Sequence, residues 1–136
     1  METIFDKIIS KEIPAAIIYE DNSTMAFLDV HPCSIGHTVV IPKKRSANIM
    51  DTDDETLAEL FRTVKKVTKK LKKALKADGF SIGLNQEKAG GQTVDHIHVH
   101  VIPRFEGDKG GNMHTIIKNP PKEGLAKVAE IIEKNS

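Results

Sequence analysis

Three histidines stand at alternate positions in the segment HIHVHVIPR, residues 96–104, with aliphatic residues between them. The chain has only six histidines, so half of them lie within five residues. In a β-strand, successive side chains point to opposite faces, so His96, His98 and His100 would share one face. Imidazole has an ordinary pKa of about 6.5, and its neutral form can attack an electrophile or bind a metal ion.

Three interpretations of this histidine row are open. The row is a solvated polar face of an antiparallel strand, a zinc site in which histidines two residues apart share one ion, or a site that transfers a phosphoryl group. The preceding residues favour the third interpretation. Gly90 and Gly91 allow a ligand to approach the backbone closely, and Gln92 and Thr93 offer hydrogen-bond donors suited to phosphate oxygens.

The composition limits the class of protein. With 136 residues, we expect one domain that spans residues 1–136. The charges nearly balance, with 20 basic and 19 acidic residues, which argues against nucleic acid as the partner. The single cysteine excludes a disulfide within the chain. No signal peptide begins the sequence and no apolar run approaches the roughly 20 residues of a membrane span, so we expect a cytoplasmic protein without membrane contact.

The elements that must position the histidines follow from the hydrophobic pattern. Short apolar runs predict a brief helix over residues 4–9 and strands over residues 17–19, 24–28, 37–41, 80–84 and 94–102. In the last strand, Ile97, Val99 and Val101 should pack on a helix while the histidines face the other way. The strands cluster with short links, which predicts an α+β fold with an antiparallel sheet and helices on one face.

A long helix is the clearest feature of the pattern. Thr52 and Glu55 form a capping-box pattern at its start, and Gly79 is expected to end it. Its apolar stripe consists of Leu57, Leu60, Phe61, Val64, Val67, Leu71 and Leu75. Seven lysines between residues 65 and 76 are interpreted as a solvated face. After a break at residues 119–121, a second helix over 123–133 should turn Leu125, Val128, Ile131 and Ile132 inward.

The segment 90–102 resembles the signature of the histidine-triad (HIT) family of nucleotide-binding proteins, in its Hint-like branch. Other segments resemble the family in the same order, so that the resemblance spans roughly residues 3–107. These segments are 4–9, 12–14, 27–30, Pro32 and 36–43. The resemblance implies a HIT-like fold with a five-stranded antiparallel sheet, a long helix and a C-terminal helix, and a sheet that continues across a homodimer.

The resemblance also implies an activity. Family members bind purine nucleotides and cleave or transfer nucleoside monophosphates through a nucleotidyl-histidine intermediate, with no metal or other cofactor. By the motif, His98 would attack the α-phosphorus, His100 would contact the phosphate and assist the leaving group, and His96 and His37 would orient the others. The remaining contacts implied are Asn85, Gln92 and Thr93 along the phosphate, Asp29 on the ribose, and an apolar slot for the base formed by Phe5, Ile8, Ile13 and Phe27.

Two departures from the family pattern matter. Some relatives carry a structural zinc, but Thr3, Asp6 and Arg45 occupy three of its four positions here, so we predict no structural zinc. The tail after Asp108 does not match the Hint branch, which leaves the leaving group open. The leading interpretation is a hydrolase or transferase for AMP-like phosphoramidates or esters. The alternatives are a diadenosine polyphosphate hydrolase and a nucleotide-binding regulatory protein without catalysis.

Overall fold

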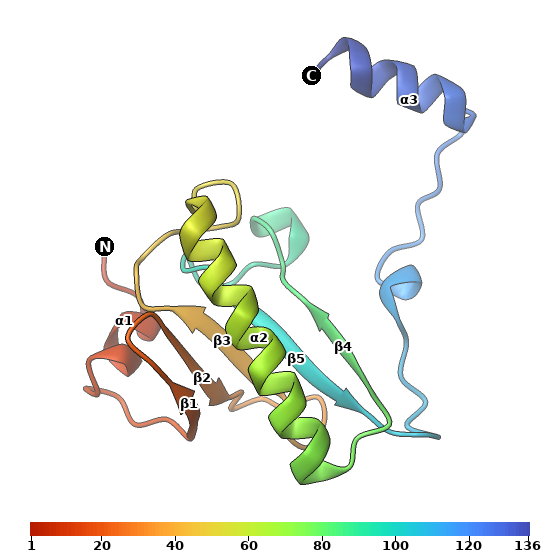
Figure 1. Ribbon diagram of the computed structural model, residues 1–136. Helices are drawn as coiled ribbons and strands as arrows, with labels where there is room; N and C mark the ends of the chain where they lie inside the picture. The colour runs from red at the N-terminus through yellow and green to blue at the C-terminus, as the bar shows by residue number, and fades with distance from the viewer.

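The computed structural model describes residues 1–136 as three α-helices, five β-strands and two short 3-10 helices (Figure 1). In chain order these are α1 (Ile4–Ile9), β1 (Ile17–Glu20), β2 (Thr24–Leu28), β3 (Thr38–Pro42), α2 (Asp54–Leu75), β4 (Gly79–Gly83), η1 (Lys88–Gly90), β5 (Val99–Arg104), η2 (Met113–Thr115) and α3 (Leu125–Lys134). The α+β class and all five predicted strands are therefore confirmed.

The five strands form one sheet in the order β1-β2-β3-β5-β4, and every pair of neighbours is antiparallel. Strand β5, which carries the end of the histidine segment, lies between β3 and β4. His100 is paired with Val39 on one side and Gly83 on the other. This central position fixes the backbone of His100 from both directions, while β4 forms an edge of the sheet.

Helix α2 covers one face of the sheet, as Figure 1 shows. The core on this face joins Leu60, Val64, Val67 and Leu71 of the helix to Ala26, Val40, Ile97, Val99 and Val101 of the sheet layer. The prediction that the aliphatic side of the histidine segment packs on the helix stripe is confirmed. Phe61 departs from the predicted stripe, because 43% of it is exposed.

The ends of α2 differ from the prediction. Asp53, not Thr52, is the N-cap, and its carboxylate accepts the Thr56 N–H at 2.8 Å. The Thr52 hydroxyl instead donates to the Asn48 carbonyl at 2.6 Å. At the other end, Lys76 adopts the left-handed conformation that stops the helix, with φ 55°. Gly79, predicted to end the helix, begins β4 instead.

Helix α1 covers the opposite face, so the prediction that the helices share one face is wrong. A capping box between Thr3 and Asp6 starts this short helix. Its buried side chains, Phe5 and Ile8, complete a second core cluster with Met25, Phe27, Val39 and Ile41. Alternate residues of β2 and β3 thus serve the two cores, because neighbouring side chains of a strand point to opposite faces.

Helix α3 lies away from the sheet at the end of an extended tail (Figure 1). Its apolar side chains are not turned inward as predicted: Leu125 is 84% exposed and Ile132 is 62% exposed. Extension of the sheet across a homodimer stays a prediction. None of the helices combines the length and the apolar character that a membrane span requires.

Candidate active site

The histidine segment meets the sheet later than predicted. Strand β5 begins at Val99, so His96 and His98 lie in extended chain before the strand, not inside a strand that starts at Val94. The Ile97 N–H donates to the Ser46 carbonyl at 2.8 Å, so at this point the segment is bonded to the loop after β3. Alternation nevertheless persists through the segment, which keeps the three imidazoles on the face opposite to α2.

The three rings lie in a row that begins beside α1. The Phe5 ring makes edge contacts with His96 and His98, at centroid distances of 5.8 Å and 5.0 Å. The His98 ring in turn contacts the His100 ring at 5.3 Å. His96 is fully buried, His98 is 7% exposed, and the His100 side chain is 22% exposed. The row therefore runs from the interior toward solvent.

One hydrogen bond decides the chemistry of His98. Its Nδ1 lies 2.7 Å from the backbone carbonyl oxygen of His96. A carbonyl oxygen only accepts, so Nδ1 carries the proton and donates. Nε2 is then the unprotonated nitrogen of the neutral ring. It makes no hydrogen bond within the chain and keeps contact with solvent. His98 thus presents an available lone pair, as a nucleophile requires.

A second chain of hydrogen bonds orients His100. The Cys33 N–H donates to Nδ1 of His37 at 3.0 Å, which leaves the His37 proton on Nε2. That Nε2 lies 2.9 Å from Nδ1 of His100 and donates to it. The proton of neutral His100 is consequently on its own Nε2, which has no partner within the chain. Beside the lone pair of His98, the site thus holds an N–H donor.

Burial keeps these imidazoles neutral. The pKa of His98 is lowered from its ordinary value, chiefly because burial disfavours the charged ring, and the bond to the His96 carbonyl opposes this only in part. Burial likewise lowers the pKa values of His37, His96 and His100. For His100, the neighbouring His98 and His37 lower the pKa further. At neutral pH the row is therefore uncharged, which favours the nucleophilic form of His98.

Asp29 directly follows β2 and lies close to His37 and His100. Its Oδ2 is 3.5 Å from Nε2 of His37 and 3.9 Å from Nδ1 of His100, and its Oδ1 accepts the His31 N–H at 2.8 Å. The donor atoms of Asp29, His37 and His100 all lie within 4.8 Å of one another, a spacing that suits a metal ion. A cation there would have to displace the proton that the Cys33 N–H keeps on Nε2 of His37. Within this cluster, His37 and His100 are joined by a hydrogen bond, and Asp29 lies at ion-pair distance from both.

Asp6 and Arg45, two of the residues at the positions that hold zinc ligands in some relatives, lie beside His96. Arg45 and Asp6 form an ion pair at 2.8 Å, and Asp6 also caps α1 through Thr3. His96 donates from Nε2 to the Pro42 carbonyl at 2.8 Å, while its buried Nδ1 has no hydrogen-bond partner and lies 3.8 Å from Asp6. Because a guanidinium stays protonated, it brings positive charge to this corner instead of a lone pair. These residues do not fit a zinc ion.

The loop before the histidines is stabilised by hydrogen bonds from the Gln92 side chain to the backbone. Oε1 of Gln92 accepts the Glu87 N–H at 2.8 Å, and its Nε2 donates to the carbonyls of Ala47 and Val94. The Gln92 amide, predicted to lie along a phosphate, is thus engaged by the backbone. Thr93 is exposed and its side chain makes no hydrogen bond within the chain. The phosphate contacts of Gln92 and Thr93 stay predictions. In this structure the Gln92 side chain stabilises the loop.

Asn85 and the glycine turn belong to the same end of the sheet. Gly91 has a φ of 97°, which side chains rarely adopt, and a Cβ there would meet the Asn85 amide at 3.4 Å. Gly91 therefore allows the turn to close against Asn85. Together with His37 and His100, Asn85 lines a groove of about 440 Å³ on the exposed side of β4 and β5. The groove is bounded on its far side by the tail around Met113.

The residues predicted to hold a base are core residues in this structure. Phe5, Ile8 and Phe27 are buried in the second core cluster, and Ile13 packs against it. Phe5 contacts the ring of Phe27 at 5.6 Å and that of His98 at 5.0 Å, so this cluster adjoins the nucleophile. Their role in holding a base stays a prediction.

Two groups were missed by sequence reasoning. The backbone N–H of Cys33 fixes the proton of His37, but a backbone donor leaves no trace in residue type. Met113 and the residues after it line the groove beside His100, although they lie outside the segments used in the prediction.

The sequence matches the HIT domain family over residues 10–107. An uncharacterized HIT-like protein of Methanocaldococcus jannaschii is 47% identical over 105 residues, covering 77% of this chain and 81% of that protein. The adenosine 5'-monophosphoramidase of Schizosaccharomyces pombe is 38% identical over 110 residues, covering 81% and 80%. A solved HIT family structure from Bacillus subtilis has a TM-score of 0.84 at 33% identity, covering 100% of this chain and 98% of that one.

Proposed function

The chain belongs to the HIT family, and from this premise and the geometry of its histidines we propose that it is a nucleotidyl hydrolase or transferase. Its substrates are purine nucleoside phosphoramidates or related mononucleotide esters, and the intermediate is a nucleotidyl-histidine. The observation that carries the proposal is the bond from Nδ1 of His98 to the His96 carbonyl, because it leaves Nε2 of a neutral, nearly buried imidazole free to attack.

In the first step, Nε2 of His98 forms a bond to the α-phosphorus while the bond from phosphorus to the leaving nitrogen breaks. The departing nitrogen takes up a proton from water at the open side of the groove. The attacking ring becomes positively charged, and the His96 carbonyl that accepts its Nδ1–H stabilises this charge. Nε2–H of His100 donates to a phosphoryl oxygen, where negative charge develops.

In the second step, water attacks the same phosphorus and the bond to His98 breaks. The products are a nucleoside monophosphate, a proton released to solvent, and neutral His98 ready for another cycle. A neutral nucleophile suits this chemistry, because an anionic one would be repelled by the charged phosphate. Division of the reaction at a covalent intermediate replaces one difficult displacement by two easier ones.

Several residues have supporting roles in the proposal. His37 orients His100 through their 2.9 Å hydrogen bond, and His96 orients His98 through its carbonyl. Asp29 is partly exposed and lies near His37 and His100. It accepts the ribose hydroxyls, because a carboxylate oxygen can accept more than one hydrogen bond. The phosphoramidase activity named for the Schizosaccharomyces pombe relative supports the reaction class. We further propose that the protein works as a cytoplasmic homodimer.

The test is the release of AMP from adenosine 5'-phosphoramidate by the purified protein. Wild type should release AMP with turnover, and His98→Ala should lower kcat by at least about a thousandfold, as for loss of a covalent nucleophile. His31→Ala is the matched control, because His31 is an exposed loop histidine whose ring makes no hydrogen bond within the chain. Turnover retained in His98→Ala would rule out His98 as nucleophile. AMP binding without turnover on any substrate would instead identify a non-catalytic nucleotide-binding protein.

A further inference from the structure

The peptide group between His96 and Ile97 is hydrogen-bonded on both of its sides. Its carbonyl accepts Nδ1–H of His98 at 2.7 Å, and its N–H donates to the Ser46 carbonyl at 2.8 Å. Because a peptide group is planar, the two bonds share one orientation, and a rotation that breaks one misdirects the other. The position of the ring proton of His98 therefore depends on where Ser46 lies.

Ser46 follows an arginine that ties this part of the chain to helix α1. Nη2 of Arg45 lies 2.8 Å from Oδ2 of Asp6, and the Asp6 side chain is only 15% exposed. The same carboxylate oxygen accepts the Thr3 N–H at 2.7 Å, at the start of α1. Burial raises the pKa of Asp6, but the bonds from Thr3 and Arg45 outweigh it and hold the pKa below its ordinary value. Asp6 is therefore charged at neutral pH, and the ion pair joins α1 to the loop after β3.

The ion pair lies directly beside His96. Oδ1 of Asp6 is 3.8 Å from Nδ1 of His96, a buried atom that has no hydrogen-bond partner. Nε2 of the same ring donates to the carbonyl of Pro42, the last residue of β3, at 2.8 Å. On α1, the Phe5 ring contacts the rings of His96 and His98. Helix α1, the end of β3 with the loop after it, and the histidine segment thus meet at one corner.

An ion pair can fix this corner in a way that apolar packing cannot. Hydrophobic attraction holds a helix against a sheet but has no direction, whereas a guanidinium–carboxylate contact fixes both distance and angle. Thr3, Asp6, Arg45 and His96 occupy the four positions that the family resemblance assigns to a structural zinc in some relatives. A metal ion would join the three segments by directed bonds. In this chain, the directed contact is the pair of Asp6 and Arg45.

We propose that the Asp6–Arg45 ion pair takes the structural place of that metal, and that both residues are positioning residues for His98. They act through Ser46 and the peptide group after His96, which keeps the proton of His98 on Nδ1 and its lone pair on Nε2. This inference rests on the proposed function and adds two residues, both outside the histidine row, on which the nucleophile depends.

The direct test is the position of the ring proton of His98, read by nitrogen NMR of protein that carries isotope-labelled histidine. The signals are assigned by comparison with His98→Ala, and no substrate is needed. In wild type, the neutral ring should carry its proton on Nδ1. Arg45→Met keeps a long apolar side chain but removes the guanidinium, so part of the His98 population should shift its proton to Nε2. Urea denaturation shows that each compared variant is folded.

Turnover provides a second readout. In the AMP-release assay, Arg45→Met should lower kcat by about 5- to 50-fold, less than the roughly hundredfold that a misplacement of about 1 Å can cost. Asp6→Asn removes the charge but keeps an oxygen for the cap of α1, so it should act in the same direction. Because the two residues form one contact, the double variant should match Arg45→Met within about twofold. Arg45→Lys should restore part of the loss, because an ammonium keeps the charge but not the planar fork.

A neighbouring ion pair offers a matched control. Lys44, the residue before Arg45, lies 2.6 Å from Asp53. Asp53 caps α2 with its carboxylate, much as Asp6 takes part in the cap of α1. Lys44→Met therefore removes the cation from a comparable pair one position away. It should leave both the ring proton of His98 and kcat unchanged.

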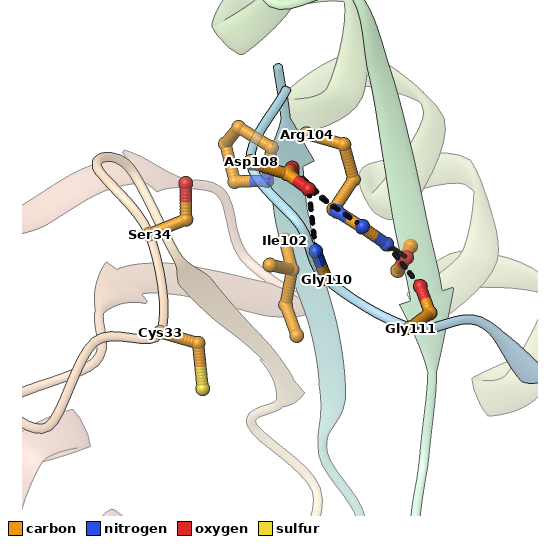
Figure 2. A pocket seen from close by; sticks show the side chains of 9 residues that line it. Cys33, Ser34, Ile102, Arg104, Asp108, Gly110 and Gly111 are labelled. Carbon is orange, nitrogen blue, oxygen red and sulfur yellow. Dashed lines mark hydrogen bonds and ion pairs between the residues drawn. The ribbon is translucent and has the colours of Figure 1, made fainter. Parts of the chain in front are cut away.

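A second control makes the same chemical change at another arginine. Arg104, at the end of β5, donates from Nε and Nη2 to the two carboxylate oxygens of Asp108 at 2.8 Å and 2.9 Å. Its Nη1 also donates to the Gly111 carbonyl, so that the guanidinium lies between Asp108 and Gly111 (Figure 2). This pair makes no hydrogen bond to the segment around His98. Arg104→Met should therefore leave the His98 proton on Nδ1.

A His98 proton that stays on Nδ1 in folded Arg45→Met, or a kcat within about twofold of wild type, would overturn the positioning role. A higher KM with the proton unmoved would also overturn it, because the pair would then only hold α1 for the proposed base contacts. Asp6→Asn supplies the same readouts if Arg45→Met does not fold. Failure of the proposed function is a separate result, in which wild type releases no AMP while the NMR experiment still locates the proton.

Discussion

The hydrogen bond from His37 to His100 offers a sharp test of how the site is organised. Replacement of His37 by phenylalanine keeps a planar ring of similar size in a position that is only 4% exposed, but removes both ring nitrogens. The variant loses the donor to Nδ1 of His100 at 2.9 Å and the acceptor of the Cys33 N–H at 3.0 Å. His100 is then free to carry its proton on Nδ1, which turns a lone pair instead of an N–H toward the phosphate.

The expected magnitude follows from these contacts. A neutral hydrogen bond contributes about 1 kcal/mol, and a partly buried acceptor left without its donor costs about 1–3 kcal/mol. Loss of orientation at His100 should therefore raise the activation barrier by about 1.5–3 kcal/mol, or lower kcat by about 10- to 150-fold. The exposed Cys33 can bond to water instead, so the loss of stability should stay near 1 kcal/mol.

The assay is AMP release from adenosine 5'-phosphoramidate by His37→Phe, with His31→Phe as the control of the same chemical change at an exposed position. Denaturation in urea reports whether the variant remains folded. A kcat within threefold of wild type, in a folded variant, would refute the argument that His37 sets the proton position of His100.

Three further predictions concern charge and packing. Because burial lowers the pKa of His98, the acid limb of kcat/KM should have its midpoint below pH 6.5, the ordinary value for histidine; a midpoint above 6.5 in the pH–rate profile would contradict this. Burial also lowers the pKa values of His37, His96 and His100, so below about pH 6.5 the unfolded chain binds more protons at these histidines than the folded chain does. The free energy of unfolding, measured by urea titration, should therefore fall as the pH is lowered below about 6.5, and a flat or rising trend would contradict this. Leu60→Ala, at a fully buried position, should cost about 2–5 kcal/mol in the same titration, whereas Phe61→Ala should cost about 0.5 kcal/mol; equal losses would mean that the exposure of Phe61 is misassigned.

Local sequence patterns predict the sheet and α2 well, because periodicity reports which side of an element is buried. Leu60, Val64, Val67 and Leu71 recur at helical spacing, and all four form the core under α2. The alternation around Ile97 likewise predicts which side packs on the helix. The position of α1 on the opposite face could not be predicted, because its two buried residues fit either face.

Errors at the ends of elements have a common physical cause. Thr52 and Asp53 are both good capping residues, and the choice between them depends on the Asn48 carbonyl, which the Thr52 hydroxyl binds instead. The late start of β5 depends on a tertiary bond from the Ile97 N–H to Ser46. Ser46 and Ile97 are far apart in the chain, so their bond leaves no local pattern. The Asn48–Thr52 contact is local, but residue type alone does not distinguish it from a helix cap.

The exposed side of α3 is a different case. The helical periodicity of Leu125, Val128 and Ile132 is present in the sequence, and the helix forms, but its apolar side packs on nothing within the chain. Periodicity predicts that a surface is apolar, not what covers it.

For the candidate site, the sequence predicts which residues gather but not how their protons are arranged. His37, more than fifty residues before His100, does lie within hydrogen-bond distance of it. The donor and acceptor assignments depend on the His96 carbonyl and the Cys33 N–H, which are backbone groups that any residue type could supply. Gln92 shows the opposite situation, since a side chain that suits phosphate is engaged by the loop.

The proposed mechanism requires that Nε2 of His98 forms a covalent bond to the nucleotide phosphorus. The most direct measurement is rapid acid-free quenching of the protein during turnover of adenosine 5'-phosphoramidate, followed by digestion and mass spectrometry of the peptide that contains residues 96–104. This mechanism predicts one adenylyl group on His98 that disappears as substrate is exhausted. An adenylyl group on His96 or His100 instead, or steady turnover by wild type with no adduct trapped at any time point, would contradict it.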